Sequence, residues 1–593
     1  MAPNRAIEHA GNLPVELTSF VGRRHEVAEL ARVLPSSRLV TLTGPGGVGK
    51  TKLALRIARE TARLYPHGTW FIELAAIQDP ALVTQAAFGA LGLQDRAARP
   101  SMARLTDYLA GKRCLLILDN CEHVLASAAL LASDILRGAP DVRILATSRQ
   151  ALGVTGEIVV DVPTLSLPEA TRPPLAEALL SDAVALFVER AQAVDRDFHL
   201  DEGNAAAVAS VCAKLDGMAL AIELAAVRLH ALGLETLDDS LTARLGVLGT
   251  GDPTRPHRQQ TLDATIDWSY QLLDDAERLL WRRLSIFAGG FEGGSAAEVC
   301  SDEVLSAARI PDLVARLVER SILKRRDGHR GGRYRILEPL RQFGRERLEE
   351  SGELITVLRR HRDWIGSLAV VAGASDSRQV EAIERIRTER ANVWSALDFC
   401  RSSPDEAEAG TSIACDLWIY WLSQGPGTEV ERLIDDLIGL VESGSRAHGR
   451  LLWVGGLLQI QLGDQRRAAR MGAEAIAVGR ALGDPEIVFW SMQTLAVAAY
   501  VDGRSDEVIA IGVESLALAK AMGWGFPRLS GTVCLVMGHS AVGGDQLILH
   551  AREGIAISEV LGETWERGSL YQFLAIGLLR RGDLPEALRA GRR

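Results

Sequence analysis

The stretch Gly44-Pro45-Gly46-Gly47-Val48-Gly49-Lys50-Thr51 is the strongest signal in the chain. It follows an apolar segment, RLVTLT at 38–43, and precedes a segment with helical periodicity at 50–65. A glycine-rich turn between a strand and a helix lets successive backbone N–H groups curl around a phosphate chain. The spacing also fits the phosphate-binding loop G-x-x-x-x-G-K-[ST], so a chance glycine-rich turn is the weaker interpretation.

The residue types in this loop predict binding of ATP with Mg²⁺. Lys50 is expected to reach the β- and γ-phosphates, and the Thr51 hydroxyl is expected to ligate Mg²⁺. The start of the helix adds partial positive charge at the phosphates. We expect the residues 44–52, which include Lys52, to contact the nucleotide.

Further apolar segments alternate with helical ones after the loop. They are TWFIEL at 69–74, RCLLILD at 113–119, VRILAT at 142–147 and EIVVDV at 157–162. Strands that are apolar throughout and separated by helices predict a parallel sheet covered on both faces. Beyond about residue 163 the strand signals stop, and helices are expected over 181–194 and 202–232.

The segment Leu115-Leu116-Ile117-Leu118-Asp119-Asn120 ends an apolar strand in a carboxylate. About 70 residues after a phosphate loop, such a strand places Asp119 beside the magnesium ion. Asn120 stands where many related ATPases have an acid that activates water, and an amide cannot take a proton at neutral pH. Hydrolysis is therefore expected to be slow, unless Glu122 serves as the base. Glu122 could equally be a solvated loop residue.

The segment Ala146-Thr147-Ser148-Arg149 ends the next strand. In phosphate-loop sheets of this type, that strand is expected to lie between the other two. Arg149 would then face the γ-phosphate, where a guanidinium can report the presence of ATP. The alternative is an exposed arginine at the end of a strand.

The middle of the chain is predicted to contain a linker and a winged helix. Residues 249–258 are rich in Gly, Pro and Arg, which is typical of a linker. A mostly helical unit follows at 259–351, with a strand-like pair at 322–325 and 333–336 joined by a glycine-rich turn. Helices followed by a small hairpin favour a winged-helix fold. The segment 353–445 is also expected to be helical.

The C-terminal part contains a repeat of about 40 residues. Turn glycines recur at Gly463, Gly503, Gly543 and Gly582, and a second set at Gly483, Gly523 and Gly562 keeps step with them. Each unit is thus expected to be a pair of helices, and such pairs stack because one pair cannot bury its own apolar face. An ordinary helical bundle with chance spacing is the alternative. The chain stops within what we expect to be the second helix of a hairpin begun near Glu566, so we expect a truncated end.

The composition narrows the class of protein. The net charge is -10 over 593 residues, so the whole-chain basic footprint of many nucleic-acid-binding proteins is absent. The seven cysteines are scattered, with no C-x-x-C pair, which favours reduced thiols over a disulfide frame or a zinc site. The sequence shows no signal peptide and no long apolar segment, so we expect a cytoplasmic protein without membrane contact.

Together with the phosphate loop, three further motifs carry a resemblance to a known class. They are FVGR at 20–23, LDGMALAIELA at 215–225 and YRILE at 334–338. The set resembles the STAND class of signal-transduction ATPases, and most closely the NB-ARC-like ATPases of bacterial LuxR-type and related regulators. The resemblance covers residues 13–351 densely and the helical remainder in architecture only.

The resemblance implies an adenine pocket. Val21 and Gly22 would line it, and the turn with Met218, Ala219 and Leu220 would close over the base. Ala219 stands where members of the class usually have proline, so the contact with adenine there would be weaker or made by the backbone.

The resemblance also implies an off state held by the winged helix. In eukaryotic relatives a histidine of this domain touches the ADP phosphate, but Leu337 stands at that place here and cannot donate such a bond. Glu338 could join a polar lock with arginines, or it could cap the next helix. In this class the winged helix usually packs on the nucleotide domain, so intramolecular regulation is favoured over DNA reading.

The predicted fold is multidomain, α/β followed by α. Its parts are an N-terminal segment at 1–19, a phosphate-loop nucleotide-binding domain at 20–165, a helical lid domain at 166–250, a winged-helix domain at 259–351, a helical linking region at 353–445 and a TPR-like solenoid at 446–593.

The predicted function is an ATP/ADP-controlled signalling switch, a bacterial transcriptional regulator or its sensor portion, with slow ATP hydrolysis. An unknown protein or small-molecule inducer would meet the helical repeats, and the ATP-bound form could be a homo-oligomer. DNA output would need a helix-turn-helix beyond Arg593 or a partner. The rivals are a phosphate-loop kinase or ATPase with conventional turnover, a passive repeat scaffold with a vestigial ATP site, and a repressor that reads DNA through its winged helix.

Overall fold

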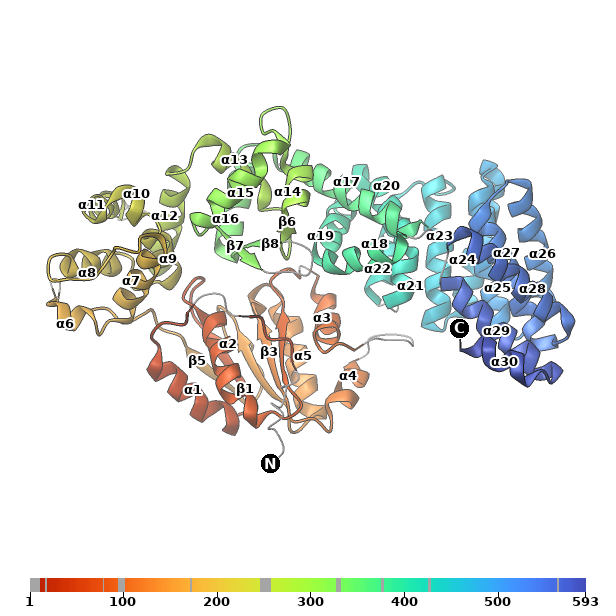
Figure 1. Ribbon diagram of the computed structural model, residues 1–593, viewed down its shortest axis with the longest axis horizontal. Coiled ribbons are helices and arrows are strands. Elements are labelled where there is room, and N and C mark those ends of the chain that lie inside the picture. Colours follow the sequence, from red (N-terminus) through yellow and green to blue (C-terminus); the bar gives the residue numbers. More distant parts are fainter. Residues whose placement is uncertain are drawn as a thin grey trace. The chain divides into compact units, whose positions relative to one another are not determined.

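The computed structural model describes residues 11–15, 19–77, 79–93, 102–170, 173–245, 257–326, 332–374, 378–424, 428–562 and 565–592 (Figure 1). Within them the chain forms two compact units, one reaching to His361 and the other beginning at Arg362. The linker expected at 249–258 lies outside the described residues up to residue 256. Most of the glycine-rich turn expected before residue 333 also lies outside them. No helix among the described residues is long and apolar enough to cross a membrane.

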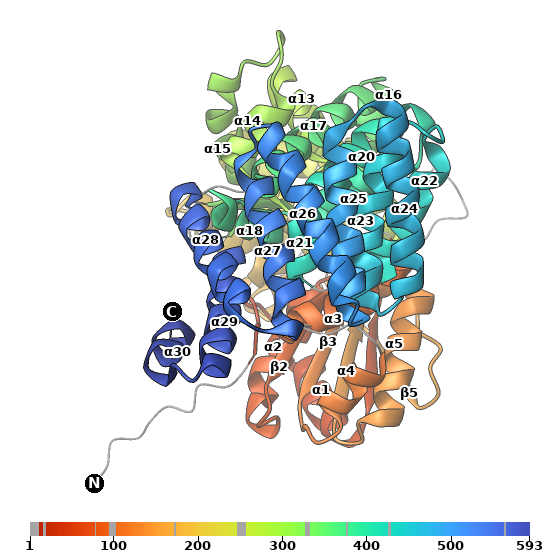
Figure 2. The same cartoon turned by 90° about the vertical axis from the view of Figure 1, so that its right-hand side faces the viewer.

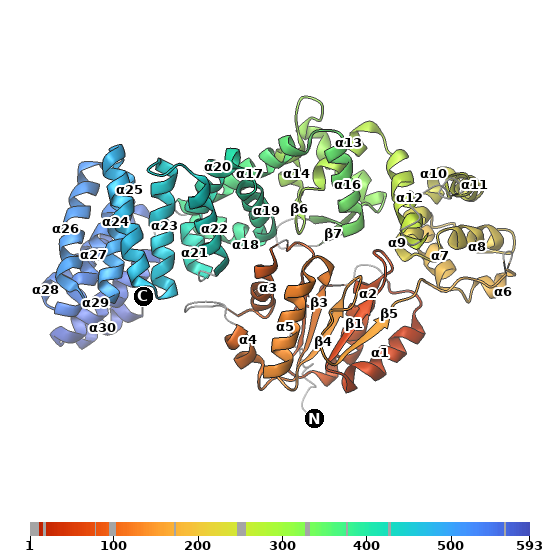
Figure 3. The same cartoon turned by 180° about the vertical axis from the view of Figure 1, so that it is seen from behind.

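A five-stranded parallel sheet forms the base of the first unit (Figure 3). Its strands are β1 (Leu39–Thr43), β2 (Thr69–Glu73), β3 (Leu115–Asp119), β4 (Arg143–Thr147) and β5 (Glu157–Asp161), in the order β2-β3-β4-β1-β5. Every residue of β1 and β3 is buried, as expected for strands covered on both faces. The predicted parallel sheet is therefore confirmed, and β4 lies between β1 and β3 as predicted.

Five helices accompany this sheet: α1 (Arg24–Ser36), α2 (Lys50–Thr61), α3 (Val83–Ala90), α4 (Met102–Leu109) and α5 (Leu125–Gly138). Leu53, Ile57 and Leu131 are among their fully or almost fully buried apolar side chains. The register pairs Leu118 with Ala146, so β3 and β4 end at the same edge of the sheet. This edge is where the chemical groups of the first unit gather.

The next segment is helical: α6 (Leu175–Ala178), α7 (Asp182–Val194), α8 (Ala205–Lys214), α9 (Ala219–Ala226), α10 (Leu229–Leu232) and α11 (Leu234–Leu245). The helical stretch expected over 202–232 is broken into three. The first break falls at Asp216 and Gly217, whose φ angles are 52° and 64°. A Cβ at Gly217 would lie 2.4 Å from the carbonyl oxygen of Leu165, so only glycine fits this turn.

A winged helix completes the first unit. It comprises α12 (His257–Gln271), α13 (Asp275–Leu284), β6 (Phe291–Glu292), α14 (Gly293–Cys300), α15 (Ile310–Glu319), β7 (Leu323–Arg326), β8 (Arg333–Ile336) and α16 (Glu338–Glu350). The antiparallel sheet order is β6-β8-β7. The hairpin was predicted, but the two-residue β6 was missed because so short a strand has no readable alternation. Buried Trp281 fastens α13 to α16 by donating from Nε1 to the Leu340 carbonyl at 3.1 Å.

The second unit is helical throughout its described residues (Figure 2). Helix α17 (Leu354–Gly373) leads into it, followed by α18 (Gln379–Thr388), α19 (Arg390–Arg401), α20 (Ala407–Asp416), α21 (Trp418–Gln424) and α22 (Thr428–Leu440). The repeats follow as α23 (Arg446–Leu462), α24 (Gln465–Leu482), α25 (Pro485–Val501), α26 (Ser505–Ala521), α27 (Gly525–Val542), α28 (Asp545–Leu561), α29 (Trp565–Arg581) and α30 (Leu584–Gly591).

The turn glycines explain the regular helix lengths in the repeats. All seven lie between consecutive helices with φ between 65° and 86°, the left-handed region that glycine adopts without steric cost. Each repeat helix packs mainly on the helices before and after it in the sequence. The predicted array of stacked helical pairs is therefore confirmed.

Replacing one turn glycine with alanine should destabilise the second unit. In Gly483→Ala the left-handed backbone is retained at a cost of about 1 kcal/mol, although the new Cβ meets no neighbour within 4 Å. The matched control is Gly568→Ala inside α29, where a Cβ is equally unobstructed and the helix should gain about 0.5–1 kcal/mol. Calorimetry of the full chain should show unfolding shifts of opposite sign, and shifts of the same sign would contradict the conformational account.

Candidate nucleotide-binding site

The glycine-rich loop at 44–49 connects β1 to α2 at the carboxyl edge of the sheet. Gly44, Gly47 and Gly49 have φ angles of 141°, 79° and 105°, which side chains rarely tolerate. At Gly44 a Cβ would also lie 3.1 Å from the carbonyl oxygen of Val162. The loop thus has the backbone conformation that lets N–H groups converge on an anion.

Lys50 is the first residue of α2, and its side chain bends back over the loop. Its Nζ donates to the carbonyl oxygens of Gly44 and Pro45, at 2.8 and 3.0 Å. Burial lowers the pKa of this ammonium, while Glu122 opposes the shift. The loop and its lysine therefore form one cationic, preorganised unit at the edge of the sheet.

Asp119, at the end of β3, lies beside Thr51. The hydroxyls of Thr51 and Thr147 both donate to Asp119 Oδ1 at 2.7 Å. Burial raises the pKa of Asp119 to about 6, although both hydroxyl bonds lower it. A hydroxyl next to a carboxylate fits Mg²⁺, which binds few protein oxygens and fills its shell with water and substrate phosphates. Thr51 and Asp119 would hold the ion, which would neutralise phosphate charge.

Asn120 occupies a left-handed backbone conformation, with φ of 62° and ψ of 55°. Asparagine is enriched among non-glycine residues in this region. Its backbone N–H donates to Thr147 Oγ1 at 3.0 Å, so the turn also orders the hydroxyl that binds Asp119. The turn thus gives Asn120 a backbone role, which sequence reasoning missed.

Glu122 and Arg149 face each other beside the loop. Their Oε1 and Nε atoms are 3.4 Å apart, and the Glu122 side chain is 19% exposed. A Cβ placed on Gly46 would lie 3.7 Å from Arg149 Nη2, so the guanidinium borders the phosphate loop. The structure therefore brings together Glu122, the candidate base, and Arg149, the candidate sensor of the γ-phosphate.

Gly22, which was expected to line the adenine pocket, lies against Asp182, a residue that was not predicted to belong to the site. A Cβ on Gly22 would overlap the Asp182 carboxylate, which accepts the Arg23 backbone N–H at 2.9 Å. The buried Arg23 side chain then donates from Nη2 to the Val48 carbonyl at 2.6 Å. Arg23 thus joins the FVGR segment, beside half-buried Val21, to the loop.

The turn before α9 also touches the loop. The backbone N–H of Leu220 donates to the Gly47 carbonyl at 3.1 Å, and buried Met218 precedes the helix. Ala219 is the first residue of α9, a position that proline tolerates because its N–H would be unpaired there. The helical segment therefore contacts the loop through backbone atoms.

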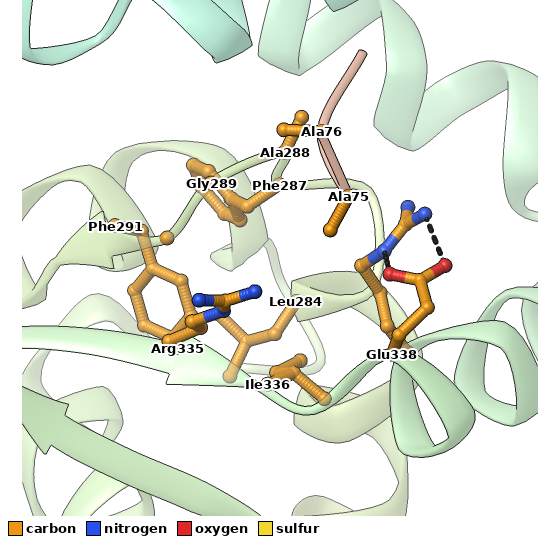
Figure 4. Close-up of a pocket in the computed structure, with 12 residues that line it drawn as sticks. Ala75, Ala76, Leu284, Phe287, Ala288, Gly289, Phe291, Arg335, Ile336 and Glu338 are labelled. Carbon is orange, nitrogen blue, oxygen red and sulfur yellow. Dashed lines mark hydrogen bonds and ion pairs between the residues drawn. The ribbon is translucent and has the colours of Figure 1, made fainter. Parts of the chain in front are cut away.

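The winged helix approaches the loop from α16. Leu337 precedes this helix, Glu338 pairs with Arg341 at 2.8 Å, and Pro339 Cγ would lie 3.5 Å from a Cβ on Gly46. Figure 4 shows Arg335 and Glu338 of the winged helix lining a small cavity, which Ala75 of the nucleotide-binding segment also lines. Glu338 was expected either to join a polar lock with arginines or to cap the next helix. In the structure its carboxylate pairs with an arginine, Arg341, within the first turn of α16.

Ion pairs among the described residues join the winged helix to the rest of the first unit. Arg335 of β8 pairs with Glu73 at the end of β2. Lys324 of β7 lies 3.2 Å from Glu223, a buried carboxylate of α9. Neither pair was predicted, because both join residues far apart in the sequence.

Glu223 also binds two other cations. Lys52 of α2 donates to it at 2.9 Å, and Arg190 of α7 at 3.2 Å. Burial would raise the pKa of Glu223, but Lys324, Lys52 and Arg190 together lower it to about 2. Lys52, which the sequence placed among the nucleotide contacts, is thus engaged by a carboxylate of the helical segment.

Comparison with known proteins agrees with this architecture. Residues 35–147 match the AAA domain, and residues 273–349 match the winged helix-turn-helix domain. The crystal structure of the Signal Transduction ATPase with Numerous Domains (STAND) protein with a tetratricopeptide repeat sensor PH0952, from Pyrococcus horikoshii, is similar at a TM-score of 0.51 and 14% identity. That likeness covers 100% of this chain and 84% of the other, and it is a likeness of fold.

Two proteins of Mycobacterium tuberculosis (strain ATCC 25618 / H37Rv) are similar in sequence. "Uncharacterized protein Rv0894" is 39% identical over 351 residues, which are 58% of this chain and 85% of that protein. "Putative HTH-type transcriptional regulator Rv0890c" is 32% identical over 567 residues, which are 94% of this chain. The chain spans 58% of the length of the latter relative.

Removing the Glu223 charge should destabilise the first unit in a pH-dependent way. Because the folded state lowers this pKa from 4.5 to about 2, the stabilisation is complete above pH 4.5 and is lost as pH falls toward 2. Glu223→Gln should therefore cost about 3 kcal/mol at pH 7 in urea unfolding, and should flatten the loss of stability below pH 4.5. The control Glu60→Gln removes an exposed pair with Arg56 and should cost less than about 0.5 kcal/mol. Equal effects of the two changes would refute the role of Glu223.

Proposed function

We propose that this chain, which belongs to the same family as Rv0894 and to the STAND class of P-loop ATPases with a helical repeat region, is a switch controlled by ATP and ADP. The observation that carries the proposal is that three parts of the first unit meet at one phosphate loop. Leu220 of the helical segment binds Gly47, and Pro339 of the winged helix borders Gly46. A nucleotide bound there influences how these parts are held together.

ATP and ADP must bind the two states of such a switch with different free energies. Arg149 provides that difference, because it borders the loop and pairs with Glu122 in the described arrangement. With ATP bound, Arg149 exchanges this carboxylate for the γ-phosphate, and with ADP bound the pair with Glu122 persists. Recognition of the nucleotide is thereby coupled to a local change of ion pairs.

Slow hydrolysis suits a switch better than rapid turnover does. Asn120 cannot act as a base, and Glu122 is available only after Arg149 releases it. A kinase or ATPase with conventional turnover would need a free base, and steady-state turnover above ~1 s⁻¹ would favour that rival. A passive scaffold with a vestigial site would not bind ATP, so a direct titration without binding would favour the other rival.

Ion pairs hold the off state in place of the histidine contact. Leu337 cannot donate to a phosphate, whereas Lys324–Glu223 and Arg335–Glu73 join the winged helix to the nucleotide-binding and helical segments. Lys52 supports the pair between Lys324 and Glu223, because it binds the same Glu223 carboxylate. The closed state is thus stabilised by charge pairing between domains.

An intramolecular role for the winged helix is supported by its charges. Arg316 of α15 pairs with Asp274 at 3.0 Å, and Arg320, directly after this helix, pairs with Glu277 at 3.1 Å. The exposed face of that helix includes Asp312 and Glu319, which would repel phosphates. A salt-sensitive gel shift by this domain would instead support direct DNA reading.

The proposed biological role is transcriptional regulation or signalling in the bacterial cytoplasm. The relative Rv0890c bears the name of a transcriptional regulator. An inducer meets the helical repeats, and the ATP-bound form assembles into a homo-oligomer. DNA is reached through a partner or through a further segment.

The nucleotide should change the protease sensitivity of the full chain. ADP and a non-hydrolysable ATP analogue with Mg²⁺ should give different patterns, and Lys50→Ala should abolish the difference by weakening phosphate binding at least tenfold. Lys112→Ala is the control, because its ammonium lies over the Tyr108 ring, outside the loop. If Lys50→Ala keeps the wild-type response, the switch proposal fails.

The role of Arg149 predicts a selective loss. Arg149→Ala should weaken binding of the ATP analogue about tenfold or more and leave ADP affinity within about twofold, because only ATP offers the γ-phosphate. Arg137→Ala on α5, an arginine that is 79% exposed, should change neither affinity. Titration calorimetry can measure both nucleotides, and an equal loss for both would remove the sensor role.

A further inference from the structure

A cavity in the second unit lies among helices α18, α21, α23, α25, α27 and α29. Its volume is about 250 Å³, and every lining residue lies within this unit. That size is near the lower end of the range of pockets that bind small organic ligands. We call it the repeat cavity.

One wall of the repeat cavity is aromatic. Trp490 of α25 lies at its centre, with ring centroids 5.3 Å from Trp418 and 5.9 Å from Phe526, and all three residues line the cavity. Behind Trp490, the ring of Trp453 stacks at 5.6 Å and fixes its orientation. A rigid aromatic wall of this kind favours a ligand with a ring that can pack flat against it.

A buried hydrogen-bond donor also lines the repeat cavity. Gln493 is 6% exposed, and its Oε1 accepts a bond from Cys534 Sγ at 2.7 Å. Among the described residues, its buried Nε2 has no hydrogen-bond partner. An unsatisfied buried donor is unfavourable, so a ligand that supplies an acceptor gains more than one that does not.

The lining offers no cation to an anionic ligand. None of the described lining residues has a positively charged side chain. A carboxylate ligand would therefore be desolvated here without a cation of the lining to pair with.

We propose that the repeat cavity binds an uncharged, ring-containing small molecule that packs on Trp490 and accepts a hydrogen bond from Gln493 Nε2. This proposal rests on the sensing role proposed for the helical repeats, and it names the chemical class of the inducer. The hydrogen bond selects a carbonyl or similar acceptor, and the aromatic wall selects the ring.

Three matched probes test the proposal on the full chain by titration calorimetry and ligand-observed NMR. They are 2-naphthamide, naphthalene and 2-naphthoate, which share a ring and differ in the acceptor and the charge. In the wild type, 2-naphthamide should bind about tenfold more tightly than naphthalene, and 2-naphthoate should bind more weakly than 2-naphthamide.

Gln493→Met should remove the preference for 2-naphthamide over naphthalene while leaving naphthalene binding within about twofold, because it removes the donor at similar volume. Gln465→Met, outside the cavity, should keep the preference. Circular dichroism verifies that both variants are folded. No binding of any probe at millimolar concentration, or a preference that survives Gln493→Met, would overturn the proposal.

Lys50→Ala separates this proposal from the switch. In titrations without nucleotide it should bind 2-naphthamide as the wild type does, because none of the described lining residues belongs to the phosphate loop. The protease assay without any probe tests the switch by itself, so either proposal can fail while the other stands.

Discussion

Burial of the Glu223 carboxylate is the constraint on which the arrangement of the first unit depends. A buried anion is unfavourable unless cations and hydrogen bonds compensate it. Here the cations come from three separate elements, Lys52 of α2, Arg190 of α7 and Lys324 of β7. Because all three pair with one carboxylate, they link the phosphate-loop helix, the helical segment and the winged helix.

The proposed switch would move this cluster between a closed and an open arrangement. If the winged helix moves away, Glu223 loses Lys324 but gains access to water, which partly replaces the lost pairing. Because water replaces part of the lost pairing, the free-energy difference between the closed and open arrangements is smaller than the energy of the Lys324–Glu223 pair alone would suggest. That balance is what a nucleotide or an inducer needs, since either can shift an equilibrium only by its differential affinity.

The features predicted from the sequence were those encoded locally. Strands buried on both faces are visible as apolar runs, the phosphate loop as glycine spacing, and the repeats as a glycine period. Glu223 and Arg23 were missed as structural residues because the contacts that tie them to the phosphate loop and its helix join residues 25 and 171 positions apart. Glu223 did leave a trace, since it is the only charged residue in the helix ALAIELAA. The left-handed turn at Asn120 was equally hidden, because only three-dimensional structure shows which conformation an asparagine adopts.

The charges of the winged helix support the role inside the molecule that we propose for it. A DNA-reading helix needs exposed cations, whereas Arg316 and Arg320 pair with the carboxylates of Asp274 and Glu277. The capping box of Asp274 and Glu277 starts α13, so the same carboxylates begin a helix and neutralise α15. Freeing these arginines would disturb the domain's own packing. The hairpin strands in turn supply cations to the rest of the first unit, because Lys324 of β7 pairs with Glu223 of α9 and Arg335 of β8 pairs with Glu73 of β2.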